Sequence, residues 1–577
     1  MEFLKNIFLF CFRLFKKVSK KNLNLIEDTR DITYKQLLDQ KIFNPTYIIR
    51  INILETKLKK YSPFTLMTYS ILLFIIFIQL TKYLKKSYNI LKNISIKQIK
   101  EYFILLVLKL PKYKSQLNKA KEDLRNELPK VFKNSTFEKI EFHDNQQDDF
   151  TIIQKLSQMS KGDEKTIKCG KLTGAVYCDN IKIQNIATEA LKIYSYSNLL
   201  HADMYCAARF IESELIKIGL NLFNGKEDSC GMTTSGGTMS ILTAMYVYIK
   251  RGRENGIENP EIVVPETVHA AFFKACEMFR AKLITIPIDP VTCQVNLSKL
   301  KNAIGKNTVC IAGSCPNFPH AIADDIEKLS DIALRYKIPL HVDCCLGGFL
   351  IAFYNKANIK IPKFDFTLPG ITSISADLHK YGLCPKGISL LLFSKKEYRR
   401  YAYFIYPHFM GGSYITTSFD GSRTAGLIAS SYAVLTYLGK NYYTNIAKRI
   451  NQAVINTREF IKKECPKLKL LGEPYICGIA FYGDKIDYVY DYLHKKGWHT
   501  NFIMNPPGVS FIYTSANMEN DKEFMKDLKE GYDTIQKGEL WELGTMTKLY
   551  GMAVPLPSSV ASFTLDALGD ALLDWKE

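Results

Sequence analysis

The chain has 577 residues, of which 47% are hydrophobic, and a formal net charge of +20 at pH 7. The positive charge is concentrated at one end, because residues 1–135 contain 27 Lys and Arg against 10 Asp and Glu, whereas the remaining 442 contain 50 against 47. No basic recognition helix or aromatic-interleaved basic patch stands out, so the composition argues against a nucleic-acid partner. The 14 cysteines show no Cys-x-x-Cys spacing, which predicts free thiols in a reducing compartment.

The first distinctive element is an uncharged run over residues 62–81, bracketed by lysines on both sides. Twenty residues at helical rise cover a hydrocarbon core, so we expect one transmembrane helix over 62–82, although a buried helix is the alternative. A basic segment over 1–61 would precede it and a basic stalk over 83–150 would follow it. Within 20 residues, four Lys and Arg lie before the run and six after it, which favours a cytosolic C-terminal part in contact with membrane lipid.

From about residue 216, short apolar runs alternate with helical stretches. Strands are expected over 261–265, 282–288, 308–313, 338–343, 373–376, 388–393, 469–471, 476–482 and 509–513, and helices over 239–250, 323–336 and from about 430. This alternation predicts an α/β fold with a mostly parallel sheet, whose ligands lie beyond the carboxyl ends of the strands. We expect an N-terminal arm over 151–215, a large domain over 216–430 and a smaller α/β domain over 431–577.

A run of small and hydroxyl residues, Thr233 to Thr238, precedes one of the expected helices. Backbone N–H groups at a helix start, together with Ser and Thr hydroxyls, can hold a phosphate, although a Gly-Gly turn also precedes helices without any ligand. His269 follows the expected strand over 261–265. A flat imidazole there can stack on an aromatic ring or serve a purely structural role.

Two charged residues follow further expected strands. Asp343 ends an apolar run, where a carboxylate can keep a pyridine nitrogen protonated or simply cap the next helix. Lys380 lies in the stretch Ser375 to Gly382, and a lysine can react with the aldehyde of pyridoxal 5′-phosphate (PLP). With the phosphate loop and the imidazole, these residues predict a PLP site. Neighbouring strand residues point to opposite faces, so 341–345 predict no metal site.

Taken together, these segments resemble the sphingosine-1-phosphate lyases, a family of the PLP-dependent group II decarboxylase superfamily. The resemblance runs from about residue 173 to the end, and the apolar N-terminal run extends it. The matching segments are 174–177 (GAVY), 197–201 (SNLLH), 228–231 (DSCG), 234–238 (TSGGT), 316–320 (PNFPH), 341–349 (HVDCCLGGF), 372–387 (TSISADLHKYGLCPKG), 421–423 (GSR) and 550–552 (YGM). The resemblance implies a fold type I, PLP-dependent transferase-like large domain and a homodimer at the endoplasmic reticulum membrane.

The resemblance also implies roles for individual residues. Lys380 would bind the cofactor aldehyde, Asp343 would pair with the pyridinium nitrogen and His269 would stack on the ring. Cys345 would pack near the other ring face, and Arg423 would either hold an anion or brace its loop. Further residues implied to contact the cofactor are Ser235, Gly236, Gly237, Thr238 and His379. Those implied in proton transfer are Tyr177, His201 and Lys386. Those implied to contact the substrate are Asn198, His201 and Arg423.

Five positions depart from the family pattern, and the departures put substrate preference or rate in doubt. Leu383 matters most because it replaces a tyrosine three residues after the cofactor lysine, which removes a hydroxyl close to the chemistry. The other four are Met239, Cys344, Leu199 and Thr424.

The predicted reaction removes a proton from the C3 hydroxyl of a phosphorylated sphingoid base and breaks the C2–C3 bond, giving a long-chain aldehyde and phosphoethanolamine. The sequence does not decide which group acts as the base, and the candidates are Lys380, His201, Tyr177, Lys386 and the cofactor phosphate. The alternatives are an amino-acid decarboxylase and a catalytically inactive membrane scaffold with the same fold. In the implied homodimer, residues of both chains line each site, with Tyr177 as the first candidate for the residue contributed by the partner.

Overall fold

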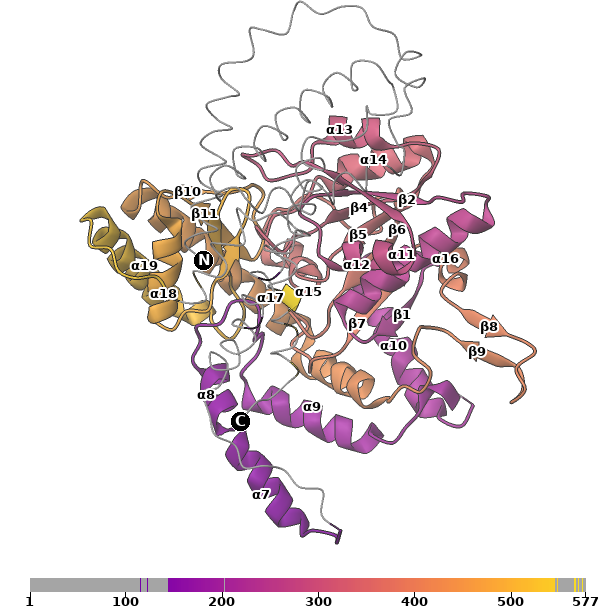
Figure 1. Cartoon of the computed structure of the whole chain (residues 1–577). Helices are drawn as coiled ribbons and strands as arrows, with labels where there is room; N and C mark the ends of the chain where they lie inside the picture. The colour runs from indigo at the N-terminus through magenta and orange to yellow at the C-terminus, as the bar shows by residue number, and fades with distance from the viewer. Residues whose placement is uncertain are drawn as a thin grey trace, which may run out of the picture. The chain divides into compact units, whose positions relative to one another are not determined.

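The computed structural model describes residues 144–201 and 203–544, together with residues 115, 122, 547, 565, 566, 569 and 573 (Figure 1). The expected membrane helix over 62–82, the segments on either side of it and the motif over 550–552 lie outside the described residues. Within the described part, no helix is both long and apolar enough to cross a membrane.

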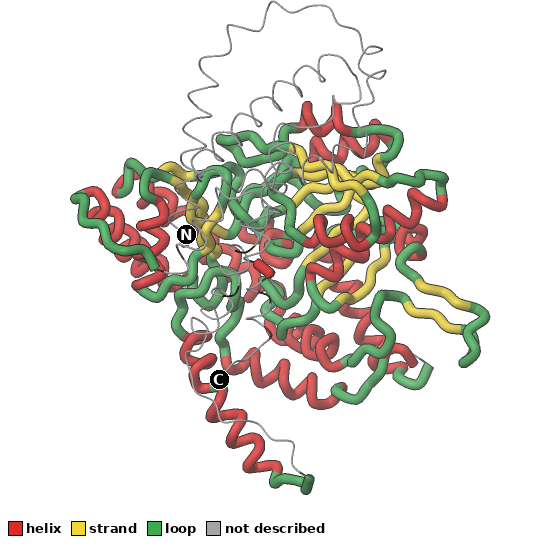
Figure 2. Tube along the Cα trace, viewed as in Figure 1, coloured by secondary structure: helices red, strands yellow, loops and turns green. Residues whose placement is uncertain are grey.

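The described chain is built around a seven-stranded sheet in the order β1-β7-β6-β5-β4-β2-β3 (Figure 2). Only β7 runs antiparallel to its neighbours, and the other six strands share one direction. The strands are β1 (Cys230–Thr234), β2 (Glu261–Pro265), β3 (Lys282–Ile286), β4 (Thr308–Ser314), β5 (Leu340–Asp343), β6 (Ile371–Ala376) and β7 (Ser389–Phe393). The expected α/β fold with a mostly parallel sheet is therefore confirmed.

Alternate side chains of the strands pack into two separate cores. In β4, Cys310 and Ala312 join the core beneath α11 and α12, whereas Ile311 joins the core on the opposite face with residues of α10 and α14. Burial on both faces explains why these strands are continuous apolar runs rather than alternating ones. The helices of this part are α10 (Cys206–Leu222), α11 (Gly237–Glu254), α12 (Ala271–Met278), α13 (Leu297–Ala303), α14 (Ile326–Tyr336), α15 (Gly348–Ile351) and α16 (Lys396–Arg400), with the 3₁₀ turn η3 (Asn355–Ala357).

A smaller antiparallel sheet, in the order β10-β11-β13-β12, follows in the chain. The long segment α17 connects the two sheets and crosses the expected domain boundary at 430–431, and its helical backbone is interrupted at Gly439, which has a φ of 64°. The elements are α17 (Gly426–Glu464), β10 (Lys469–Leu470), β11 (Gly478–Tyr482), α18 (Ile486–Lys495), β12 (Asn501–Ile503), β13 (Gly508–Ile512), η4 (Met518–Asn520) and α19 (Asp521–Gln536).

Within the described residues, four elements precede α10, and one of them anchors the arm to the rest of the fold. Helix α9 packs along α17, and its N-terminus is capped by Asn180, whose side chain accepts hydrogen bonds from the backbone N–H groups of Lys182 and Ile183. The four elements are α7 (Asp149–Met159), α8 (Lys161–Lys168), α9 (Ile181–Tyr194) and the 3₁₀ turn η2 (Leu199–His201).

The glycine-rich stretch around residues 410–414 forms the end of a hairpin. Strands β8 (Phe404–Tyr406) and β9 (Tyr414–Thr416) pair only with each other and extend away from the large sheet in Figure 1. Several large apolar side chains of this hairpin are exposed, and Met410 is fully so. Alternating aromatic and β-branched residues favour these two strands, which the sequence analysis did not predict.

We expect Gly370→Ala to destabilise the fold, because a Cβ at this position would lie 2.3 Å from the backbone oxygen of Ser330 in α14. Gly370 directly precedes β6, so the strand cannot move away without disturbing its pairing with β5. The expected loss in the free energy of unfolding is about 2 kcal/mol, measured by chemical denaturation. Gly305→Ala is the matched control, since nothing lies within 4 Å of its added Cβ. Equal stability of both variants would contradict this packing argument.

Candidate active site

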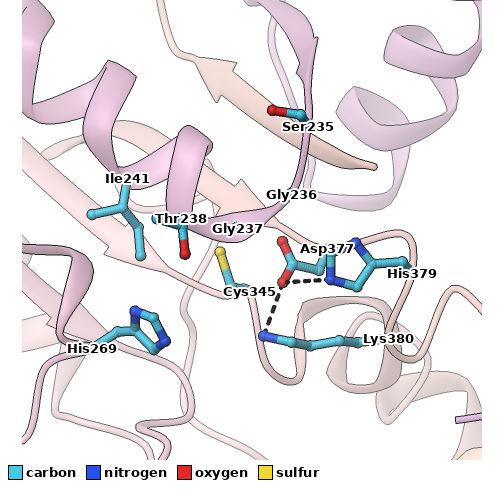
Figure 3. A pocket seen from close by; sticks show the side chains of 10 residues that line it. All are labelled: Ser235, Gly236, Gly237, Thr238, Ile241, His269, Cys345, Asp377, His379 and Lys380. Atoms are coloured by element: carbon cyan, nitrogen blue, oxygen red, sulfur yellow. Dashed lines mark ion pairs between the residues drawn. The ribbon is translucent and has the colours of Figure 1, made fainter. Parts of the chain in front are cut away.

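A cavity of about 300 Å³ opens at the carboxyl edge of the large sheet (Figure 3). Its lining comes from the segments that follow β1, β2, β5 and β6, as expected for the carboxyl ends of parallel strands. The lining residues are Ser235, Gly236, Gly237, Thr238, Ile241, His269, Cys345, Asp377, His379 and Lys380. Eight of the nine residues predicted to bind the cofactor are among them, and Asp343 is the exception.

One wall of the cavity is the N-terminus of α11. Gly236 precedes the helix with a φ of 117°, a left-handed conformation that glycine adopts without strain, and no side chain caps the helix. A Cβ on Gly237 would lie 2.6 Å from the Asp377 carboxylate and 2.9 Å from Cys345 Sγ, so only glycine fits there. The backbone N–H groups of the first turn are consequently open to an anion in the cavity.

Asp343, at the last position of β5, is not among the lining residues but is hydrogen-bonded to one of them, Cys345. Its Oδ1 accepts hydrogen bonds from the backbone N–H of Cys345 at 3.0 Å and from the Ser375 hydroxyl at 3.2 Å. Among the described residues, none donates a hydrogen bond to its Oδ2. Asp343 was also considered as a cap for the next helix. That helix is α15, which begins at Gly348, and no side chain caps its N-terminus.

The ammonium group of Lys380 pairs with a buried carboxylate that the sequence analysis gave no role. Asp377 Oδ2 lies 2.8 Å from Lys380 Nζ, and Asp377 is only 2% exposed. Burial is the largest single effect and lowers the pKa of Lys380, but the charge and hydrogen bond of Asp377, together with Tyr177 and Cys345, outweigh burial and raise that pKa above its ordinary value. The other carboxylate oxygen, Oδ1, is buried without a hydrogen-bond partner among the described residues. The signal in the sequence was the i, i+3 spacing of Asp377 and Lys380.

His379 is oriented by two contacts. Its Nδ1 accepts a hydrogen bond from the backbone N–H of Ile388 at 3.2 Å, which leaves the Nε2 proton facing Asp377 Oδ2 at 3.5 Å. Burial lowers the pKa of His379, and the opposing effect of Asp377 is smaller. The ring is therefore neutral near pH 7, and its Nε2–H is a donor at the cavity wall. His269 is held similarly, because its Nδ1 accepts from the backbone N–H of Ala271 at 3.1 Å.

Tyr177 and Lys386 adjoin this cluster without lining the cavity. Lys386 Nζ lies 4.8 Å from the ring centre of Tyr177 and donates to the His379 carbonyl at 3.4 Å. Burial and the neighbouring Lys380 lower the pKa of Lys386, whereas burial raises the pKa of the Tyr177 hydroxyl. In the single chain Tyr177 thus packs beside a lysine of its own chain, and the expectation that it serves the partner's site stays a prediction.

The remaining predicted substrate residues lie elsewhere. His201 is exposed on η2 and does not line the cavity. Asn198 holds the neighbouring loop, donating to Ser422 Oγ at 3.0 Å and accepting from the backbone N–H of Arg423. The Arg423 guanidinium pairs with both carboxylate oxygens of Glu212, at 2.9 and 3.3 Å. In the single chain Arg423 therefore braces its loop through the Glu212 carboxylate, which is one of the two roles left open for it in the sequence.

The residues that depart from the family pattern all lie outside the cavity lining. They are Met239, Cys344, Leu199, Leu383 and Thr424. Leu383 is buried with a φ of 59°, and its backbone N–H donates to the Lys380 carbonyl in a tight turn. Leu383 therefore places an apolar side chain, without the hydroxyl of a tyrosine, in a buried position next to Lys380.

The residues present fit PLP. The open N-terminus of α11 suits a phosphate, the Lys380 amine suits an aldehyde, and the free Oδ2 of Asp343 suits a protonated pyridine nitrogen. The cavity has room for a group of that size, with the imidazole of His269 at its side (Figure 3). A phosphate-bearing aromatic aldehyde satisfies all of these groups at once.

Comparison with known proteins agrees with this fit. Residues 213–482 match the family model described as the pyridoxal-dependent decarboxylase conserved domain. The chain is 34% identical over 558 residues to sphingosine-1-phosphate lyase 1 of Mus musculus, covering 92% of this chain and 96% of that protein. It is 37% identical over 410 residues to sphingosine-1-phosphate lyase of Dictyostelium discoideum, covering 70% and 77%. The solved sphingosine-1-phosphate lyase of Burkholderia pseudomallei superposes with a TM-score of 0.67 at 32% identity, covering 71% and 96%.

We expect Asp377→Asn to shift the reactivity of Lys380 to lower pH. Without the carboxylate, burial and Lys386 disfavour the ammonium form, so the free amine appears at a lower pH than in the unaltered protein. Mass spectrometry of the cofactor-free protein, labelled with an amine reagent across a pH series, measures the midpoint for Lys380. Asp163→Asn in α8 is the control. A midpoint that stays in place would show that Asp377 does not set the protonation of Lys380.

Proposed function

This chain belongs to the sphingosine-1-phosphate lyase family of PLP-dependent lyases, and on that premise we propose which of its residues carry out the cleavage of a phosphorylated sphingoid base. The observation that supports the proposal is the meeting of Lys380, Asp377, His269 and the α11 N-terminus in one cavity, where the lining residue Cys345 is hydrogen-bonded to Asp343. The products are a long-chain aldehyde and phosphoethanolamine.

The cofactor would be held at three points. The first turn of α11 would bind its phosphate, Lys380 Nζ would bind its aldehyde carbon, and Asp343 Oδ2 would pair with its ring nitrogen. His269 and Cys345, which both line the cavity, would contact the ring. When bound, PLP supplies the electron sink that accepts the electron pair of the broken C2–C3 bond.

The proton of the C3 hydroxyl moves to the Lys386 and Tyr177 pair in this proposal. Lys386 has a lowered pKa, so a larger fraction of it than of an exposed lysine is the free amine, the form that can accept a proton, near neutral pH. The Tyr177 hydroxyl has a raised pKa and therefore stays protonated as a hydrogen-bond donor beside it. Removal of the C3 hydroxyl proton turns C3 into the carbonyl carbon of the aldehyde, and C2 takes up a proton before phosphoethanolamine leaves.

The direct test is turnover with sphingosine 1-phosphate, with glutamate and an aromatic amino acid as competing candidates. We expect the purified full chain to release a long-chain aldehyde and phosphoethanolamine, and Lys380→Ala to lose all turnover and the pyridoxyl adduct that borohydride traps. Lys386→Ala should keep the adduct and lose at least about tenfold in rate, as expected for the loss of a general acid–base group. Lys301→Ala, on α13, is the control. Release of CO₂ from an amino acid without cleavage of sphingosine 1-phosphate would overturn the substrate assignment.

We also propose that the active unit is a homodimer in which His201 completes the partner's site. Two observations support this: His201 is exposed and away from its own chain's cavity, and the β8–β9 hairpin exposes a contiguous set of large apolar side chains. The exposed hairpin residues are Phe404, Ile405, Tyr406, Phe409, Met410 and Ile415.

Co-expression of two inactive chains tests the shared site. Lys380→Ala chains combined with His201→Ala chains should recover part of the activity, because a mixed dimer contains one site with both residues intact. Lys380→Ala combined with Tyr177→Phe should recover none, because Tyr177 serves its own chain. Recovery of activity only with the Tyr177→Phe chains would mean that Tyr177, and not His201, serves the partner's site. A fully active monomer in sedimentation would exclude the homodimer.

We further propose a single-pass anchor over residues 62–82 in the endoplasmic reticulum membrane, with the catalytic domain in the cytosol. The uncharged run with its flanking lysines supports the anchor, and the thiols of the described part, all of them free, support a reducing compartment. An alkaline carbonate wash should leave the full chain in the membrane pellet, and protease should reach the catalytic domain in sealed microsomes. Protection of that domain would reverse the orientation.

A further inference from the structure

A continuous chain of buried polar side chains leads away from Asp343 between β5, β6 and α11. We propose that this chain, with His341 as its central positioning residue, fixes the orientation of the Asp343 carboxylate and keeps its Oδ2 an acceptor toward the cavity. The inference rests on the proposed contact between Asp343 and the cofactor ring nitrogen. The members of the chain are Asp343, Ser375, His341, Ser373 and Tyr248, and we call them the Asp343 relay.

Strand register brings the relay together. In the pairing of β5 with β6, His341 lies opposite Ser373 and Asp343 lies opposite Ser375. Residues two apart on a strand share a face, so all four side chains project to the same side of the sheet. Helix α11 covers that side and adds Tyr248. The patterns His-x-Asp in β5 and Ser-x-Ser in β6 are therefore one structural unit.

The hydrogen bonds of the relay are continuous. Ser375 Oγ lies 3.2 Å from Asp343 Oδ1 and 3.2 Å from His341 Nε2. His341 Nδ1 lies 2.8 Å from Ser373 Oγ, and Ser373 Oγ in turn lies 2.6 Å from the Tyr248 hydroxyl. His341, Ser373, Ser375 and Tyr248 are at most 1% exposed, so water does not compete for these bonds.

The donors of the relay all point toward Asp343. Burial lowers the pKa of His341 to about 4, so the ring is neutral and carries one N–H at pH 7. Because Ser375 donates its hydroxyl proton to Asp343, its oxygen accepts from His341 Nε2–H. His341 Nδ1 then accepts from Ser373, whose oxygen accepts from Tyr248. One tautomer of one histidine thus sets the direction of every bond.

This direction matters for the chemistry of Asp343. Its Oδ1 already accepts two hydrogen bonds, from Cys345 N–H and Ser375 O–H. These two donors occupy Oδ1 and fix the rotation of the carboxylate, so Oδ2 is the oxygen left free to accept a further hydrogen bond. His341 is not among the residues that line the cavity, so its effect passes through Ser375 and Asp343.

The experiment compares the holoenzymes of the full chain and three variants after reconstitution with PLP labelled with ¹⁵N in the ring. Solid-state ¹⁵N NMR reports whether the ring nitrogen carries a proton, and titration of the cofactor-free protein gives the PLP dissociation constant. His341→Leu should move the resonance toward that of a neutral pyridine and raise the dissociation constant roughly tenfold, as expected for losing one hydrogen bond to a charged group.

Two further variants separate positioning from simple loss of packing. His341→Gln keeps an N–H donor for Ser375 and should restore the resonance and most of the affinity. Ser330→Ala is the matched control: it removes a buried hydroxyl that accepts from the Gly370 N–H on α14's side of the sheet, and it should leave both readouts unchanged.

Three results would overturn the proposal. They are an unaltered resonance in His341→Leu, a His341→Gln variant no better than His341→Leu, and an equal loss in Ser330→Ala. If His341→Leu does not fold, Ser373→Ala takes its place, and an unaltered resonance there counts against the relay. A separate variant, Asp343→Asn, tests the proposed function itself. If Asp343 does not contact the ring nitrogen, this variant should leave the ¹⁵N resonance of the bound cofactor where it is in the unaltered protein.

Discussion

An ion pair between Lys380 and the buried carboxylate of Asp377 is the constraint around which the active site is arranged. A buried carboxylate needs a cationic partner, since an unpaired buried charge is costly. Lys380 supplies that partner at 2.8 Å, and space for the carboxylate exists only because Gly237 has no side chain. The same contact brings the N-terminus of α11 against the lysine turn. One electrostatic pair thus places the anion-binding helix end and the reactive amine on opposite sides of a single cavity.

The large sheet gives this arrangement its rigidity. Its central strands are buried on both faces, and strand β6 continues directly into Asp377, His379 and Lys380. Only a few residues separate each strand end from the side chain that lines the cavity. The backbone between them therefore has few alternative conformations, and the side chains keep fixed relative positions. Polar residues within the sheet are tolerated because they satisfy one another: the serines of β6 face His341 and Asp343 of β5. The Asp343 carboxylate and the side chains that hold it are therefore part of the core itself.

Local sequence predicted much of this. The strands that end at Pro265, Asp343 and Ala376 were expected from short apolar runs. The structure confirms the first at its expected bounds and the other two with starts shifted by two residues. The carboxyl-edge site followed from the same reasoning, because parallel strands present their C-terminal ends together. The hairpin of β8 and β9 was missed, since its glycine-rich tip dominated the pattern and its strands are only three residues long.

By itself the sequence determined the residue types and their order. They are a glycine-rich loop suited to a phosphate, the imidazole of His269, the carboxylate of Asp343 and the amine of Lys380, each at or after the end of a strand. Only the tertiary structure decided which of these meet. Arg423 pairs with Glu212, 211 residues earlier in the chain, and Tyr177 packs beside Lys386, contacts that no local pattern encodes. The position of Asp377 between Gly237 and Lys380 was equally invisible, because α11 and the turn after β6 come together only when the sheet forms. Local propensities fix the elements, whereas long-range packing fixes the distances on which the chemistry depends.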